Sequence, residues 1–266
     1  MGIAYRERIE GERSENIERA IAAYEAALLV YARDAFPTDW AMIHLKLGTA
    51  YADRHGGDRA ENTERAIQAY EAALNIYTPE DFPTDWAMTQ NNLGTAYAER
   101  IWGDRADNLD RAVQSLQAVL ETSYLPERLP KESRTVAQNL ARLHEEQRNW
   151  NAAHSALRLA LQAAEHLYTA ALTEEGNTAE IDENAYLYRQ MVDVCLHLDP
   201  PRRLEAFLHV EEGRSRLLRD QLAALPIPLP LQVPAELIEK ERVLLQVAHN
   251  LETTIATASN EAARRT

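Results

Sequence analysis

The sequence repeats itself at a fixed spacing of 46 residues. The segment FPTDWAM at Phe36–Met42 recurs unchanged at Phe82–Met88. Two further segments return at the same spacing: LGTAYA at Leu47 and Leu93, and AYEAAL at Ala23 and Ala69. Repeats of this length are typical of proteins built by stacking one small structural unit, which cannot bury its apolar side alone. The chain is therefore predicted to be an array of similar units.

Each unit is predicted to form two helices. Pro37, followed by Thr38 and Asp39, suits a helix start, since proline is favoured in the first turn and side-chain oxygens can accept bonds from free N–H groups. This first helix is expected to run to about Asp53, before the glycine turn at residues 55–58. The second helix carries an apolar stripe at helical spacing: Ala66, Tyr70, Ala73 and Tyr77. The many Ala, Leu, Glu and Arg residues also favour an all-α fold.

The units become less regular after Leu120, and Leu129-Pro130 matches Phe82-Pro83 only at a spacing of 47. Further helices are expected at about residues 149–172, 181–197 and 202–224, with a loop at 174–177 and a helix stop at Asp199-Pro-Pro201. The predicted organisation is a repeat array over residues 1–225, a proline-rich linker over 226–234, and an amphipathic helix over 235–266. The last segment carries an apolar stripe: Leu237, Leu244, Ala248, Leu251 and Ile255.

Two short patterns resemble the tetratricopeptide repeat. They are Leu-Gly-x-x-Tyr in the first helix, at Leu47, Gly48 and Tyr51, and Ala-x-x-x-Tyr-x-x-Ala in the second, at Ala66, Tyr70 and Ala73. The spacing of 46 residues exceeds the 34 that this family usually has, so longer helices and loops are implied. The resemblance implies an α-solenoid of helical hairpins.

The 46-residue units, the segment EEGRSRLL from Glu211 and the proline-rich linker look like the repeat region of bacterial CHAT-domain proteins. The resemblance covers Ala4 to about Gln246. In that family such repeats sense signals for, or hold, a C-terminal caspase-like peptidase domain, and this sequence ends where that domain is expected to begin. The segment Ala4–Ile9 matches only the second half of a first helix. We therefore expect a fragment or a decayed gene copy, with a natural short form as the alternative.

Charge and cysteine content narrow the classes of partner and compartment. The formal net charge of −14 and the pI near 5.1 disfavour nucleic acid and anionic membranes as partners. The single cysteine, Cys195, excludes an internal disulfide and suits a reducing compartment. No segment suggests a signal peptide or a membrane span, so a cytoplasmic location is expected.

No pattern in the sequence predicts an active site, a cofactor or a metal. Cys195 is expected to be a buried helical residue, and His197, two positions away, should point to another side of the helix. The three histidines His154, His166 and His209 occur singly, without the spacing of a metal motif. The glycine turns are not preceded by the strand that a phosphate-binding loop requires. The chain is therefore predicted not to be an enzyme.

A protein or peptide is the expected partner. In tetratricopeptide arrays the first helices line the binding surface, and the Leu-Gly-x-x-Tyr register assigns eight positions to it: Thr49, Asp53, Asn91, Thr95, Glu99, Gln138, Arg142 and Glu145. The acids among them would favour a basic ligand, and an ordinary solvated face is the alternative. Trp40 and Trp86 are expected to pack between units. Alternative functions are a structural spacer, an arm that self-associates through the stripe 237–255, and a fragment of a cysteine-peptidase-associated enzyme.

Overall fold

The structure is a computed structural model that describes residues 13–122, 129–171 and 181–224, with side chains undescribed at 168–171, 181–185 and 216–224. Within those ranges all regular structure is helical, as predicted. The helices are α2 (Arg13–Leu28), α3 (Pro37–Ala52), α4 (Arg59–Leu74), α5 (Pro83–Glu99), α6 (Arg105–Glu121), α8 (Pro130–Glu146), α9 (Trp150–Ala171), α10 (Ile181–His197) and α11 (Arg203–Ala224). The predictions for segment 4–9, loop 174–177, linker 226–234 and helix 235–266 concern residues outside the described ranges.

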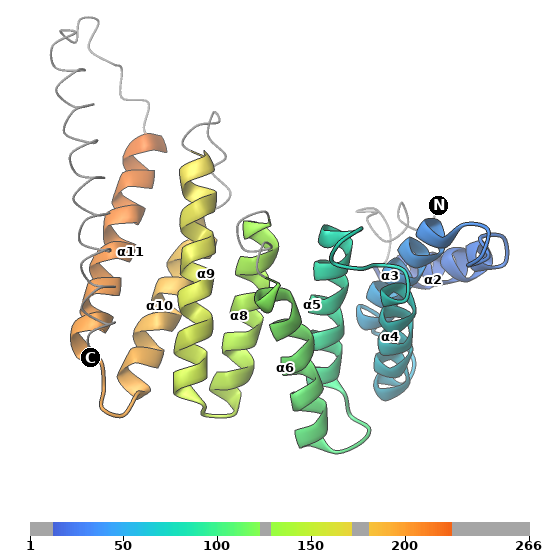
Figure 1. Ribbon diagram of the computed structural model, residues 1–266, viewed down its shortest axis with the longest axis horizontal. Coiled ribbons are helices and arrows are strands. Elements are labelled where there is room, and N and C mark those ends of the chain that lie inside the picture. The colour runs from blue at the N-terminus through green and yellow to red at the C-terminus, as the bar shows by residue number, and fades with distance from the viewer. Residues whose placement is uncertain (1–12, 123–128, 172–180, 225–266) are drawn as a thin grey trace, which may run out of the picture. The chain divides into compact units, whose positions relative to one another are not determined.

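From α2 to α10, helices that follow one another in the chain pack side by side, and residues up to Leu218 belong to one compact unit (Figure 1). The most extensive contacts join α3 with α4, α5 with α6, and α8 with α9, so each of these pairs is a helical hairpin. Neighbouring hairpins meet through α4 with α5, α6 with α8, and α9 with α10. The first helices α3, α5 and α8 also contact one another in turn. The chain is thus an α-solenoid of helical hairpins.

The first helices begin at the proline, as predicted, but their capping differs from the sequence-based expectation. Helix α3 begins at Pro37, and the capping position belongs to Phe36, which makes no side-chain cap bond. The prediction that Thr38 or Asp39 caps the helix was wrong, because starting at the proline places both residues inside the first turn. An acidic side chain there still favours the positive end of the helix dipole. The second helices do have side-chain caps: Asp58 accepts from the Glu61 N–H at 3.0 Å.

The close approach of the two helices in a hairpin depends on glycine. A Cβ atom added to Gly48 on α3 would lie 2.7 Å from Cε1 of Tyr70 on α4. Gly94, its counterpart on α5, faces Leu116 in the same way, at 2.9 Å from Cγ. The buried Tyr70 ring therefore fills the space that the missing side chain leaves, which explains why Leu-Gly-x-x-Tyr and Ala-x-x-x-Tyr occur together.

Aromatic side chains fill the junctions between units, as predicted. Trp86 is buried, and Trp40 packs partly against the core. Tyr77 is also buried, although α4 already ends at Leu74, so this ring reaches the core from the loop and not from the helix stripe. Burial, and then the nearby carboxylates of Asp85 and Asp39, raise the pKa of Tyr77 to about 12. The loop between units is therefore part of the packed interior.

The less regular second half of the array follows the expected helix boundaries. Helices α9, α10 and α11 begin and end within one residue of the predicted ranges, and the segment at Asp199-Pro-Pro201 separates the last two. Helix α9 is capped by Asn149, whose Oδ1 accepts from the Ala152 N–H at 3.3 Å. Within the described part of the chain, no helix combines the length and apolarity needed to cross a membrane.

Candidate functional site

Each of the first two hairpins is tied to the helix before it by an arginine fork. Arg54, just after α3, donates two hydrogen bonds to Glu18 on α2, at 2.7 and 2.8 Å. A third bond runs from the same guanidinium to Asn62 on α4, at 3.2 Å. Asn62 donates in turn to the carbonyl of Gly56, whose neighbour Gly57 has a positive φ of 78°. One arginine thus fixes two helices and the glycine turn between them.

The same arrangement recurs 46 residues later. Arg100 donates to Glu64 at 2.6 and 2.8 Å and to Asn108 at 3.3 Å, and Asn108 donates to the carbonyl of Trp102 at 2.9 Å. Gly103, with a φ of 85°, takes the place of Gly57. The repeat in the sequence therefore encodes a repeated polar junction as well as a repeated core.

A tyrosine forms the second part of this junction. The hydroxyl of Tyr51 donates to Glu25 on α2 at 2.5 Å and accepts from Arg65 on α4 at 3.1 Å. Tyr97 does the same with Glu71 and Arg111, at 2.5 and 3.3 Å.

In the third unit these residue types are lost: His144 stands at the position of Tyr97, Gln147 at Arg100 and Gln117 at Glu71. His144 is buried, and desolvation, against a hydrogen bond with Gln147, lowers its pKa.

The eight predicted partner-binding residues lie on the first helices or immediately after them, and we call this set the first-helix row. Thr49 and Thr95 turn their hydroxyls back to their own helix, donating to the carbonyls of Leu45 and Asn91 at 3.0 and 3.1 Å. Both threonines are half-buried. Their donors are therefore already used, and what they offer to a partner is a methyl group and acceptor capacity.

Two members of the row link neighbouring first helices. Asn91 on α5 accepts a hydrogen bond from Asn139 on α8 at 2.8 Å. Glu145 on α8 accepts one from Gln190 on α10 at 2.7 Å. Gln138 lies half-buried on α8, beside Asn139 in the chain. Asn91 and Glu145 thus bond to neighbouring helices, through the partners Asn139 and Gln190, which the Leu-Gly-x-x-Tyr register does not assign to the row.

Two charged members of the row, Glu99 and Arg142, form ion pairs within the chain. Glu99 accepts from Arg59, the first residue of α4, at 3.4 Å, and Arg142 donates to Glu146 on its own helix at 2.9 Å. The Arg59 pair has a counterpart in the next unit, where Arg105 lies 3.8 Å from Glu146. Asp53 follows α3 directly, and its backbone N–H donates to the carbonyl of Thr49 at 3.0 Å.

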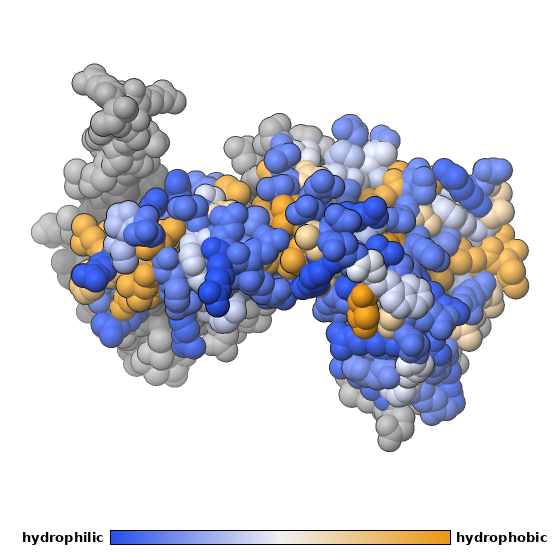
Figure 2. Space-filling view, turned by 90° about the horizontal axis from the view of Figure 1, so that it is seen from below, coloured by the Kyte–Doolittle hydropathy of each residue, from blue (hydrophilic) through white to orange (hydrophobic). Residues whose placement is uncertain are grey.

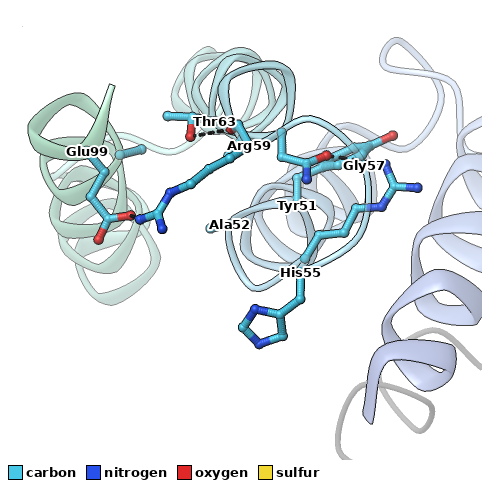
Figure 3. A pocket seen from close by; sticks show the side chains of 11 residues that line it. Tyr51, Ala52, His55, Gly57, Arg59, Thr63 and Glu99 are labelled. Atoms are coloured by element: carbon cyan, nitrogen blue, oxygen red, sulfur yellow. Dashed lines mark hydrogen bonds and ion pairs between the residues drawn. The ribbon is translucent and has the colours of Figure 1, made fainter. Parts of the chain in front are cut away.

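A pocket of about 230 Å³ lies beside Glu99, between the ends of α3 and α5 and the start of α4. Figure 3 shows Arg59 reaching from α4 toward Glu99, with Thr63 behind it and His55 projecting from the end of α3. Sequence reasoning found Glu99 but missed Arg59. The recurrence of Gly-Asp-Arg at residues 57–59 and 103–105 was the available signal, since it repeats at the spacing of the units.

A second cluster joins residues that sequence reasoning treated singly. His154 on α9, Cys195 on α10 and Glu205 on α11 place their donor atoms within 4.8 Å of one another. Cys195 is buried, as predicted, and burial, with the charge of Glu205, raises its pKa to about 11. His197 is exposed and stacks on Trp150, which confirms that it points elsewhere. No spacing motif marks this cluster, because its members come from three different helices.

Comparison with known proteins adds no identification to this geometry. A scan against models of known protein families finds no match, and a comparison with curated proteins finds none either.

Proposed function

We propose that this chain is a non-catalytic scaffold or sensor module that holds a peptide or an adjoining protein domain along the first-helix row. The observation that carries the proposal is the regular presentation of half-exposed side chains on consecutive first helices. Met42 and Met88 occupy the same position of α3 and α5, 46 residues apart, and are 38% and 36% exposed. Each is followed at helical spacing by polar members of the row.

Hydrogen bonds hold the helices of the row in position, whereas the exposed ion pairs of the row can be replaced by bonds to a partner. The arginines of the two forks, Arg54 and Arg100, have side chains only 26% and 23% exposed, and their bonds hold the ends of the first helices in place. By contrast, Glu99 and Arg59 are 52% and 75% exposed, and ion pairs this exposed contribute little to stability. A charged group on a partner can therefore replace Arg59 at little cost. Methionine side chains such as those of Met42 and Met88 adapt to apolar surfaces of different shape, which also suits the binding of a partner.

The preferred partner class follows from charge and from the resemblance to CHAT proteins. The acids of the row, with a net charge of −14 for the chain, favour a peptide or surface that carries basic residues. The resemblance makes a caspase-like peptidase domain of a bacterial, cytoplasmic protein the first partner to test, in the same chain or in another.

The row is tested by selecting peptides from a random display library on this protein and measuring their affinity by calorimetry. The double variant Asn91→Ala with Glu99→Lys should weaken binding of a selected peptide by about tenfold or more. A matched control is Gln114→Ala with Glu121→Lys, since both residues are exposed on the second helix α6 and the change in charge is the same.

Equal affinity for the row variant and the original chain would remove the row from the binding function. Helical content measured by circular dichroism identifies any variant that has lost its fold. The CHAT proposal needs a separate test: the coding DNA on both sides of these 266 residues is sequenced. A reading frame without a peptidase-like domain, in the same gene or beside it, would contradict that part.

An exposed apolar stripe favours self-association as a second candidate function. Leu204, Phe207 and Leu208 occupy one side of the first turns of α11 and are 74%, 59% and 52% exposed. Figure 2 shows apolar side chains gathered most densely toward the two ends of one face, with mostly hydrophilic surface between them. Light scattering should then give an oligomer that Phe207→Ser dissociates. A monomer at high concentration excludes this candidate.

A further inference from the structure

Three side chains with different donor atoms converge where α9, α10 and α11 meet. Nε2 of His154 lies 2.8 Å from Oε1 of Glu205, and Sγ of Cys195 completes a group whose donor atoms all lie within 4.8 Å. Cys195 is fully buried and the His154 side chain is 6% exposed, while that of Glu205 is 31% exposed. The cluster is thus closed on the cysteine side and opens to solvent beside the carboxylate.

The backbone holds two of these residues in place. The N–H of Arg202 donates to the carbonyl of Cys195 at 2.9 Å, which ties the start of α11 to the end of α10. Glu205 follows about one helical turn after Arg202, so this bond holds the start of α11, which carries the carboxylate, close to the residue that carries the thiol. His154 approaches from α9, which packs against α10. The convergence therefore depends on helix packing and not on one mobile loop.

We propose that His154, Cys195 and Glu205 bind one divalent transition metal ion, with zinc as the ion that this donor set fits best. Imidazole nitrogen, thiolate sulfur and carboxylate oxygen are the three donor types that zinc takes in proteins. In a tetrahedral site with bond lengths of 2.0–2.3 Å the donor atoms stand about 3.5 Å apart. The observed spread needs shifts of only about 1 Å to reach that geometry. A water molecule takes the fourth position.

Two neighbouring side chains, Arg202 and His209, also lie close to the Glu205 carboxylate. NH1 of Arg202 lies 3.2 Å from Oε2 of Glu205 and 3.5 Å from Nε2 of His154. Its side chain is 50% exposed, so it can turn into solvent when the metal binds. Nε2 of His209 lies 4.0 Å from Oε1 of Glu205, and its Nδ1 pairs with Glu212 at 3.0 Å. His209 thus stands beside the site, with its far nitrogen paired to a carboxylate as in many metal sites.

Metal binding would join the last three described helices through one centre. Cys195 binds as the thiolate: its Sγ–H proton passes to solvent as the Sγ–metal bond forms, and no electron is transferred. Because the unfolded chain has no such convergent donors, the ion stabilises the folded state, and the melting temperature rises with the concentration of free ion above the Kd.

The site is tested on the full chain, without a histidine tag, by titration with Co²⁺ as a spectroscopic substitute for zinc. We expect one ion per chain, a sulfur-to-cobalt charge-transfer band in the near ultraviolet, and visible bands of tetrahedral intensity that Zn²⁺ abolishes by competition. The charge-transfer band should be absent from Cys195→Ser. Glu205→Gln and His154→Gln should each weaken Co²⁺ binding by about tenfold or more.

His166→Gln is the matched control, because His166 is an exposed histidine on the same helix as His154, and it should bind Co²⁺ as the original chain does. Circular dichroism checks the fold, and Glu205→Gln keeps the test decisive if Cys195→Ser fails to fold. Absence of the band in the original chain, persistence of the band in Cys195→Ser, or equal affinity in Glu205→Gln would overturn the proposal.

Discussion

Arg100 and Glu64 face each other as a two-pronged ion pair, with Nε and NH2 of the guanidinium donating to separate carboxylate oxygens at 2.6 and 2.8 Å. Their side chains are only 23% and 14% exposed, so the pair is better shielded from water than the pairs of Arg19, Arg54, Arg59 and Arg65. Hydrogen bonding to Glu64, against desolvation, raises the pKa of Arg100. This pair joins α4 to the end of α5 and fixes how one unit follows another.

Removing this pair should destabilise the array. Arg100→Ala leaves a shielded carboxylate without its partner, and we expect the free energy of unfolding in urea to fall by about 1–2 kcal/mol. Arg19→Ala is the control, because Arg19 pairs with Glu15 on the exposed surface of a single helix. Its effect should stay within about 0.5 kcal/mol. Equal losses of stability in Arg100→Ala and Arg19→Ala would show that the shielded ion pair contributes no more than an exposed one.

The glycine of the Leu-Gly-x-x-Tyr pattern should not tolerate a methyl group. In Gly48→Ala the new Cβ would lie 2.7 and 2.8 Å from two carbons of the Tyr70 ring, which is fully buried and cannot move aside. We expect a loss of about 1–3 kcal/mol in thermal or urea unfolding. Gly56→Ala is the comparison, because its Cβ meets one atom at 3.2 Å, Oε1 of Glu18 in the Arg54 fork, and should therefore cost less than Gly48→Ala. A harmless Gly48→Ala would contradict the packing described for α3 and α4.

Glu145 should make stability depend on pH. Desolvation is the largest effect on this carboxyl and raises its pKa, against the hydrogen bond from Gln190. A carboxyl whose pKa is higher in the folded state holds its proton more tightly there. The free energy of unfolding therefore falls as the pH rises from the unfolded pKa through the folded one.

The variant Glu145→Gln removes the charge and keeps an oxygen that can accept from Gln190. We expect it to be more stable than the original chain at neutral pH, with the difference vanishing below about pH 4, where Glu145 is protonated in both states. Urea unfolding at a series of pH values measures this directly. A gain of the same size at every pH would point to packing instead of charge.

The thiol of Cys195 should be unreactive in the folded chain. It has no exposed surface, and a pKa of about 11 leaves almost no thiolate at neutral pH. A colorimetric disulfide reagent at about pH 8 should therefore detect no thiol until urea unfolds the protein, and then one thiol per chain. Rapid reaction of the folded protein would mean that α10 and α11 separate readily.

Much of the hairpin architecture could be predicted because the repeat is so regular. The apolar stripe with Ala66, Tyr70 and Ala73 was expected to be hidden by packing between helices, and all three residues are buried. The boundaries of α10 agree with the prediction at both ends. The predicted cap of α3 was wrong: Thr38 and Asp39 were expected to cap the helix, but the capping position belongs to Phe36. Local sequence does not show whether a helix begins at the proline or after it, because both choices satisfy the same preferences.

The candidate site was predictable only in part. The register identified which helix positions make up the first-helix row, but not that Asn91 binds Asn139 or that Glu99 faces Arg59. The pocket beside Glu99 and the His154 cluster had no motif of their own. Such contacts join residues about 40 to 50 positions apart, and their geometry depends on how separate helices pack, which no local pattern shows.

The sequence by itself determined that this protein is a stack of helical hairpins, because a recurring apolar stripe can be hidden only against the next copy of the same unit. The tertiary structure alone decided which polar side chains tie the units together, which remain at the surface, and that His154, Cys195 and Glu205 meet. The physical reason is that helix periodicity is local, whereas side chains from three separate helices come together only when all the helices are packed.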